Sequence, residues 1–145
     1  MTWPSIAERL APARSYWLNT VDRDGGPHVV PVWGAVLSGV WYSYTERSTS
    51  RARNLAGDPR VAVHLDDAED VLIVHGTLVD IGPPNGRSDV VKAFAAKYTR
   101  PDDVPFLPSS DPAFDVLVAL RPTRALAWRL SDYENSHRRW RIIRT

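Results

Sequence analysis

The chain has 145 residues, of which 43% are hydrophobic and 24% are charged, a composition typical of a folded globular protein. Its formal net charge of +1 argues against a dedicated nucleic-acid binder, and it contains no run of about 18 apolar residues that could cross a membrane. Without cysteine there can be no disulfide, thiolate metal site or cysteine nucleophile. We therefore expect one domain over residues 1–145 and, because the N-terminus lacks a signal-peptide pattern, a cytoplasmic location by default.

The first part of the chain predicts a short helix and then a β-hairpin. Ser5 and Glu8 form a capping-box pattern with Ser5 as the N-cap, and the helix should end before Pro12. Aromatic and β-branched residues predict a strand over Ser15–Val21, followed by a turn over Asp22–Gly26.

The next two strands are expected over His28–Leu37 and Val40–Tyr44. Pro31 places the first of them at a sheet edge or at a bulge, because proline cannot donate a hydrogen bond to the ladder. A second short helix should follow, with Ser48 or Ser50 as its cap.

This second helix should run through Leu55. We expect Gly57 to end it in the left-handed conformation and Pro59 to prevent its continuation.

The second half of the chain predicts two strands, a helix, a loop rich in proline and aspartate, and two final strands. Their expected ranges are Arg60–Leu65, Val71–Ile81, Arg87–Tyr98, Thr99–Pro112, Phe114–Leu120 and Arg124–Leu130. About six or seven strands joined by hairpins, without alternating long helices, predict a mainly β fold: an antiparallel barrel with short peripheral helices.

Aromatic residues gather on two neighbouring strands in the segment VVPVWGAVLSGVWYSY (29–44). Trp33, Trp41, Tyr42 and Tyr44 lie on or beside these strands, close to Pro31. Such a surface can hold a flat conjugated ring, although an aromatic barrel core would give the same pattern.

Hydroxyl and arginine side chains gather where the second helix begins. Ser48, Thr49 and Ser50 are followed by Arg51 and Arg53. A helix N-terminus favours an anion, and arginine adds a charged, bidentate donor. Capping explains one of these hydroxyls but requires neither all three nor the arginines, so the segment suggests a phosphate site.

Other catalytic patterns are missing from the sequence. None of the four histidines has metal-ligand spacing, and no nucleophile elbow, P-loop or dinucleotide fingerprint occurs. The tail HRRWRIIR (137–144) could contact nucleic acid through Trp140, but a terminal strand with exposed arginines is the commoner explanation.

Residues 6–140 resemble the pyridoxamine 5′-phosphate oxidase-like superfamily of flavin and deazaflavin oxidoreductases, which have a split β-barrel. The resemblance rests on the order of WLNTVDRDGGPHVVPVW (17–33), VWYSYTERSTSRARNLAGDPRVAV (40–63), VLIVHGTLVDI (71–81) and RALAWR (124–129). Its most specific part is the pattern S/T-x-[KR]-x-x-N-L-x-x-[DN]-P-R-V, which spans Thr49 to Val61.

The resemblance implies a homodimer whose two cofactor sites lie at the interface, and it implies which residues bind the cofactor. Those beside the ring are Pro31, Val32 and Trp33; those under the ring or its ribityl chain are Tyr42 and Ser43; those at the phosphate are Ser48, Thr49, Ser50, Arg51 and Arg53; and those reaching over from the partner subunit are Trp128 and Arg129. Asn54 and Leu55 would fix the helix.

The resemblance also implies hydride transfer between the cofactor and a small organic substrate of unknown identity. We favour coenzyme F-420 over FMN, because Arg47, Arg53, Arg60 and the basic tail could bind its oligoglutamate extension. The alternatives are an FMN-dependent oxidoreductase and a non-catalytic carrier of flavin, F-420 or haem.

Two departures from the family pattern limit the expected activity. Arg51 stands where many members have lysine, and the substrate motif of true pyridoxamine phosphate oxidases is not recognisable, so pyridoxal phosphate synthesis is not assigned. No catalytic residue is assigned either. Tyr44, His28 and Arg129 are candidates for protonating the product, and the segments 87–98 and 99–112 are expected to shape the substrate pocket.

Overall fold

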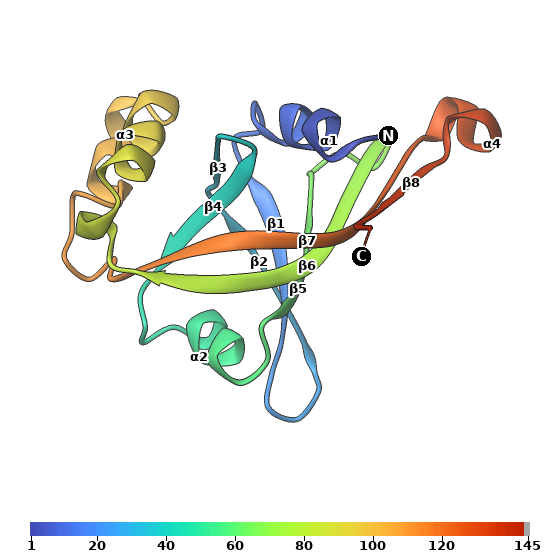
Figure 1. Cartoon of the computed structure of the whole chain (residues 1–145). Helices are drawn as coiled ribbons and strands as arrows, with labels where there is room; N and C mark the ends of the chain where they lie inside the picture. The colour runs from blue at the N-terminus through green and yellow to red at the C-terminus, as the bar shows by residue number, and fades with distance from the viewer. Residues whose placement is uncertain (144–145) are drawn as a thin grey trace.

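The computed structural model describes residues 1–143 and shows one antiparallel sheet with short helices around it (Figure 1). Eight strands are present in these residues, in the order β2-β1-β5-β6-β7-β4-β3, with β8 paired to β7. The strands are β1 (Tyr16–Val21), β2 (Pro27–Val32), β3 (Ala35–Leu37), β4 (Val40–Thr45), β5 (Arg60–His64), β6 (Asp70–Gly82), β7 (Val116–Arg129) and β8 (Arg138–Arg141). The mainly β fold is confirmed, with more strands than the six or seven expected.

Helices and 3-10 turns connect or flank these strands. They are α1 (Trp3–Leu10), α2 (Ser50–Gly57), η1 (Pro84–Gly86), α3 (Ser88–Lys97), η2 (Pro101–Phe106), η3 (Leu130–Asp132) and α4 (Tyr133–Ser136). Figure 1 shows α3 and the segment after it at one side of the sheet, and α4 with β8 at the opposite side. No helix among residues 1–143 is long and apolar enough to cross a membrane.

The β6–β7 hairpin forms the long centre of the sheet. β7 is one strand, so the expected pair of separate strands over Phe114–Leu120 and Arg124–Leu130 was wrong. Pro122 lies next to a register shift at Gly76, and a Cβ at Gly76 would lie 2.2 Å from the carbonyl oxygen of Arg121. This irregularity lets β7 continue through a proline, because the local ladder is already interrupted.

The N-terminal elements differ from expectation at their ends. The N-cap of α1 is Thr2, whose hydroxyl accepts from the backbone amide of Ser5, so Ser5 is the third helical residue rather than the cap. β2 is an edge strand, as Pro31 predicted. The strand expected over residues 28–37 divides at Gly34, where a Cβ would lie 2.4 Å from Nε1 of Trp41. Only a glycine lets the backbone pass this close to the indole.

The side chains of β4 alternate between two hydrophobic clusters. Trp41 is fully buried in the main core inside the sheet, while Tyr42 and Tyr44 pack in a second cluster with Phe94 and Tyr98 of and after α3. Both faces of β4 are therefore covered, and α3 is fixed against one of them by buried aromatic rings.

The loop expected over Thr99–Pro112 contains the 3-10 turn η2, so it is not wholly irregular. The terminal strand expected in the tail is present as β8, and the short helix α4 precedes it. β8 adds the expected exposed arginines to the edge of β7, while Arg144 of the tail lies outside the described residues.

Candidate functional site

The first turn of α2 is capped by Thr49, not by Ser48 or Ser50. The Thr49 hydroxyl accepts from the amide of Ala52 and donates to the carbonyl of Glu46. The helix ends at Gly57, as expected, but the predicted left-handed conformation was wrong, because Gly57 is not among the glycines with positive φ. The chain continues through Asp58 in an extended conformation.

A cavity of about 400 Å³ lies between the β2–β3 connection and the start of α2. Its lining residues are Ser15, Pro31, Val32, Trp33, Tyr44, Arg51, Phe106 and Phe114. Four of the predicted cofactor-binding residues are thus brought together, three from the end of β2 and Arg51 from α2. The aromatic segment and the arginine segment of the sequence meet in one place.

Arg51 is the one charged residue that lines this cavity. Its side chain is half-buried, and burial lowers the pKa of its guanidinium from the ordinary value, although Glu46 and Tyr44 nearby favour the charged form. Arginine stays charged despite such a shift. Among residues 1–143 no acceptor forms an ion pair or hydrogen bond with this guanidinium, so a half-buried positive charge faces the cavity unpaired.

The backbone next to Arg51 offers further donors. Within the described residues the amides of Ser50 and Arg51, at the start of α2, donate no hydrogen bond. Amide donors, the positive end of the helix and a guanidinium together match the chemistry of a phosphate group. The residues present therefore fit a phosphorylated cofactor.

Trp33 forms a flat wall of the cavity and is held from behind. Its ring stacks on Tyr98 with centroids 4.1 Å apart and an interplanar angle of 7°. The guanidinium of Arg14 lies 5.4 Å from both ring centroids and pairs with the buried carboxylate of Asp103. These contacts fix the orientation of the indole without any ligand.

A polar cluster lies directly behind this stack. The Tyr98 hydroxyl accepts from the amide of Gly34 at 3.0 Å, and the ammonium of Lys97 donates to the hydroxyl of Tyr16 and to the carbonyl of Gly34, at 2.9 and 2.7 Å. Burial, with a smaller contribution from the charge of Arg14, lowers the pKa of Lys97 from 10.5 to about 8. Burial also raises the pKa of Tyr98 to about 12.

Tyr42 and Ser43 do not line the cavity. Both are buried, at 7% and 2% exposure. The Tyr42 hydroxyl accepts from Arg87, and the Ser43 hydroxyl donates to the carbonyl of Trp33 at 2.7 Å. In this chain Ser43 holds the backbone of Trp33 in place, and Tyr42 connects β4 to Arg87, which directly precedes α3.

Two of the predicted phosphate residues, Ser50 and Arg53, line a different cavity beside the start of α2. Arg53 donates to the carbonyl of Ser48 and to the hydroxyl of Ser50. Ser50 and Arg53 line a neighbouring cavity of about 720 Å³ together with His28, one of the candidate proton donors. Ser48 is exposed and, like Thr49, lines neither cavity.

Trp128 and Arg129 lie at the far end of β7 from the cavity. Val116, at the start of β7, pairs with β4 beside the cavity, whereas Trp128, near the end of β7, lies opposite Val71 of β6. The 12 residues from Val116 to Trp128 span roughly 40 Å of strand. Trp128 stacks on His137. The predicted contribution of these two residues would therefore have to be made to another subunit's site.

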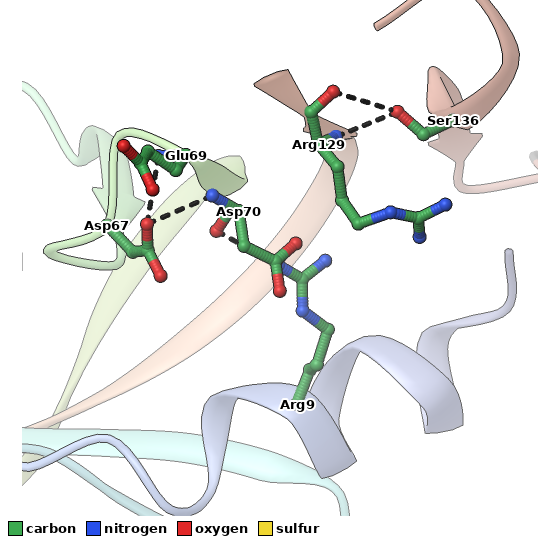
Figure 2. Close-up of polar contacts among 6 residues, drawn as sticks. All are labelled: Arg9, Asp67, Glu69, Asp70, Arg129 and Ser136. Carbon is green, nitrogen blue, oxygen red and sulfur yellow. Dashed lines mark hydrogen bonds and ion pairs between the residues drawn. The ribbon is translucent and has the colours of Figure 1, made fainter. Parts of the chain in front are cut away.

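Figure 2 shows how this far end is held. The backbone amide of Arg129 donates to the hydroxyl of Ser136, which in turn donates to the Arg129 carbonyl. In the same region Arg9 of α1 pairs with Asp70 at 3.0 Å. The Arg129 guanidinium is exposed and lies 3.9 Å from Asp132, which leaves it available at the surface.

Three lining residues were not predicted individually. Ser15 directly precedes β1, Phe106 ends η2, and Phe114 precedes β7. Phe106 lies in segment 99–112, which was expected to shape the substrate pocket, but no pattern distinguished it from the neighbouring Val104 and Leu107. Of the candidate proton donors, only Tyr44 lines the cavity; burial raises its pKa, and its hydroxyl donates to the Phe106 carbonyl.

Metal chemistry finds no support in the described part of the chain. Residues 1–143 contain no group of three or more histidine or acidic side chains placed to hold a metal ion. The cavity itself has no carboxylate or imidazole on its walls.

Comparisons with known proteins agree with this arrangement. A family model described as pyridoxamine 5′-phosphate oxidase matches residues 2–129. No curated protein sequence matches the chain.

Among solved structures, a conserved hypothetical protein from Mycobacterium tuberculosis is 25% identical with a TM-score of 0.71, over 89% of this chain and 85% of that one. An F420 reductase is 28% identical with a TM-score of 0.65, over 81% of this chain and 94% of that one. The haem storage protein of Vibrio cholerae is 18% identical with a TM-score of 0.65, over 82% of this chain and 88% of that one, which shows a shared fold.

The family match covers most of the chain, and the sheet carries the split β-barrel architecture of these structures. The chain therefore belongs to the pyridoxamine 5′-phosphate oxidase-like family.

Proposed function

We propose that this protein is an oxidoreductase that binds coenzyme F-420 in the 400 Å³ cavity, with FMN as the alternative cofactor. The observation that supports this most strongly is Arg51, a half-buried cation without a partner among residues 1–143, in the same cavity as a fixed indole. A phosphate would neutralise the charge, and a conjugated ring would cover the apolar wall.

The chain's own residues would bind and orient the cofactor. Arg51 would hold the phosphate through its guanidinium and its own backbone amide, while Trp33, Pro31 and Val32 would border the ring. Once bound, the cofactor would supply a ring that carries hydride. The aromatic walls would exclude water and fix the distance to a substrate.

The F-420 assignment is favoured by similarity to the F420 reductase structure, which is 28% identical. The structure qualifies the idea that nearby arginines bind an oligoglutamate extension. Arg47 pairs with Asp80, and Arg60 pairs with Asp58, at 3.0 and 2.7 Å. These ion pairs are at the surface and contribute little to the stability of the fold. The carboxylates of a polyanion could therefore replace the aspartates as partners of the two arginines.

The proposal includes a homodimer. Trp128 and Arg129 lie too far along β7 to serve the cavity of their own chain, and the exposed Arg129 is free to act on the cavity of a second copy. Size-exclusion chromatography with light scattering measures this directly, and a monomer at micromolar concentration would refute a shared site.

Cofactor binding is tested with two pairs of ligands. FMN and riboflavin differ only in the phosphate, whereas F-420 and its deazaflavin alcohol differ in the phosphate and the oligoglutamate extension together. The protein should bind the phosphorylated member of each pair at least 10-fold more tightly. Fluorescence or absorbance titration gives the dissociation constants, with haemin as a third ligand. Equal affinity within each pair would show that Arg51 holds no phosphate.

Enzyme and carrier are then separated by turnover. Reduced cofactor, mixed with the protein and a panel of small organic acceptors, should be oxidised faster than in the protein-free control. Tight binding with no acceleration for any acceptor would favour a carrier.

A further inference from the structure

Phe106 lies at the mouth of the cavity in an unusual setting for a large apolar side chain. It lines the cavity and yet is 58% exposed. Among the aromatic side chains of residues 1–143, the next most exposed is that of Tyr133, at 52%. Exposed apolar side chains are common singly, so exposure alone decides nothing. What matters is how firmly Phe106 is held and what surrounds it.

The backbone of Phe106 is anchored from two directions. The hydroxyl of buried Tyr44 donates to its carbonyl. The turn η2 that carries it is fixed through Asp103, whose buried carboxylate accepts from the amide of Arg100 and pairs with Arg14. The backbone that carries the ring is thus held by Tyr44 of β4 and by Arg14, which precedes β1.

Three more rings line the same cavity, those of Trp33, Tyr44 and Phe114. Phe114 packs edge-on against the buried Tyr44, with centroids 5.3 Å apart, and Trp33 is fixed by its stack on Tyr98. Phe106 is the ring of the four that stays mostly exposed to solvent. Covering it with an apolar group would remove water from its surface, which is favourable in proportion to the area covered.

The charge of the site limits what that group can be. Arg51 is the only charged residue on the cavity wall, and under the proposed function its charge is matched by the cofactor phosphate. No other charged side chain of the same subunit lines the cavity. The walls near Phe106 offer rings and little else.

From this arrangement we infer that Phe106 is a specificity-determining residue, which selects a substrate with a planar ring system and stacks against it. The inference rests on the proposed function, in which the cofactor occupies the Arg51 and Trp33 side of the cavity. It assigns the turn η2 a role in substrate selection.

The test uses two probes of the same carbon skeleton, 2-naphthol and decahydro-2-naphthol, which differ in planarity. Calorimetric titration is made on protein already saturated with its cofactor. The wild type should bind the planar probe at least about 5-fold more tightly, and Phe106→Ala should weaken that binding about 10-fold and remove the preference. Phe106→Tyr, which keeps the ring, should retain it.

Val104→Ala is the matched control, because Val104 lies in the same turn at 54% exposure and does not line the cavity. It should change 2-naphthol binding by less than about 2-fold. Equal losses in both variants, or unchanged binding in Phe106→Ala, would overturn the inference.

Cofactor affinity, measured separately, distinguishes the two proposals. Phe106→Ala should change it by less than about 3-fold, and a larger loss would mean that Phe106 covers the cofactor rather than the substrate. If the wild type bound neither F-420 nor FMN, the proposed function would fail, whatever the probes showed.

Discussion

Two arginines approach the aromatic surface around Trp33, and their surroundings differ. Arg14 is 5.4 Å from the Trp33 and Tyr98 ring centroids and pairs with the buried carboxylate of Asp103. Arg51 reaches the same cavity without an acceptor among the described residues. The charge of Arg14 is balanced by an ion pair within the chain, whereas the Arg51 guanidinium has no such partner among the described residues.

This difference separates a structural region from a binding region. A paired cation with stacked rings stabilises the fold and need not touch a ligand. An unpaired, half-buried cation costs free energy in the isolated chain, which an anionic ligand would return. Substitutions on the two sides should therefore affect different measurements.

The largest expected effect is on the Arg14 side. Tyr98→Ala should lower the free energy of unfolding by about 3–5 kcal/mol, because Tyr98 is 1% exposed and supports Trp33, Phe94 and the amide of Gly34. Urea unfolding followed by circular dichroism measures the loss. Tyr133→Ala, at a tyrosine that is 52% exposed, should stay within about 0.5 kcal/mol of the wild type.

If Tyr98→Ala does not fold, Tyr98→Phe still tests the comparison. It keeps the ring and removes the hydroxyl that accepts from Gly34, for an expected loss of about 1–2 kcal/mol. No loss in that variant would contradict a structural role for the cluster.

The second effect is on the Arg51 side and concerns affinity. Arg51→Ala should weaken F-420 or FMN binding about 100-fold, equivalent to 2–3 kcal/mol, through loss of a charge-assisted bidentate contact. Its free energy of unfolding should not fall, because a partly buried charge is removed.

Arg51→Lys and Arg139→Ala serve as controls for this variant. The lysine keeps the charge without the planar fork and should bind with intermediate affinity. Arg139 is exposed on β8 and should not matter. A destabilised Arg51→Ala with normal cofactor affinity would reverse the roles assigned to the two arginines.

The smallest effect is a pH dependence from Lys97. Its pKa is about 8 in the folded protein against 10.5 as the ordinary value, because burial disfavours its charge. Between these pH values the unfolded chain binds a proton that the folded chain does not, so stability should rise with pH from about 8 to 10.

Lys97→Met removes this titration. As the pH rises over this window, the unfolding free energy of the wild type should increase relative to that of the variant, by at most about 1 kcal/mol per pH unit. Urea unfolding at pH 7, 8, 9 and 9.5 measures it. Parallel pH profiles for the two proteins would show that the Lys97 ammonium is not desolvated by the cluster behind Trp33.

Much of the fold could be predicted from local patterns. Pro31 placed β2 at the edge, and the turn over residues 22–26 joined β1 to β2. The errors came where tertiary contacts decide. The expected strand divides at Gly34, where the backbone passes close to the indole of Trp41. Pro122 does not interrupt β7, because the ladder shifts register next to it.

The candidate site was predictable in its two halves but not in its outline. The residue types of the 31–33 and 48–53 segments suggested a ring and an anion, and the structure brings Trp33 and Arg51 to one cavity. Which hydroxyl caps the helix depends on the path of the chain, and Thr49 does so. Phe106 could not be placed, because its position depends on a turn held by distant Tyr44 and Asp103.

The pairing of β4 with β7 also has a consequence for how the protein folds. It joins Tyr44 to Leu117, residues 73 positions apart, while the β1–β2 hairpin joins neighbours in sequence. Closing so long a loop is slow compared with forming a hairpin. The cavity, whose walls come from residues as distant as Ser15 and Phe114, is then complete only at the end of folding. A partly folded chain would contain the β1–β2 hairpin but not the cavity, so ligand binding would measure only the fully folded molecules.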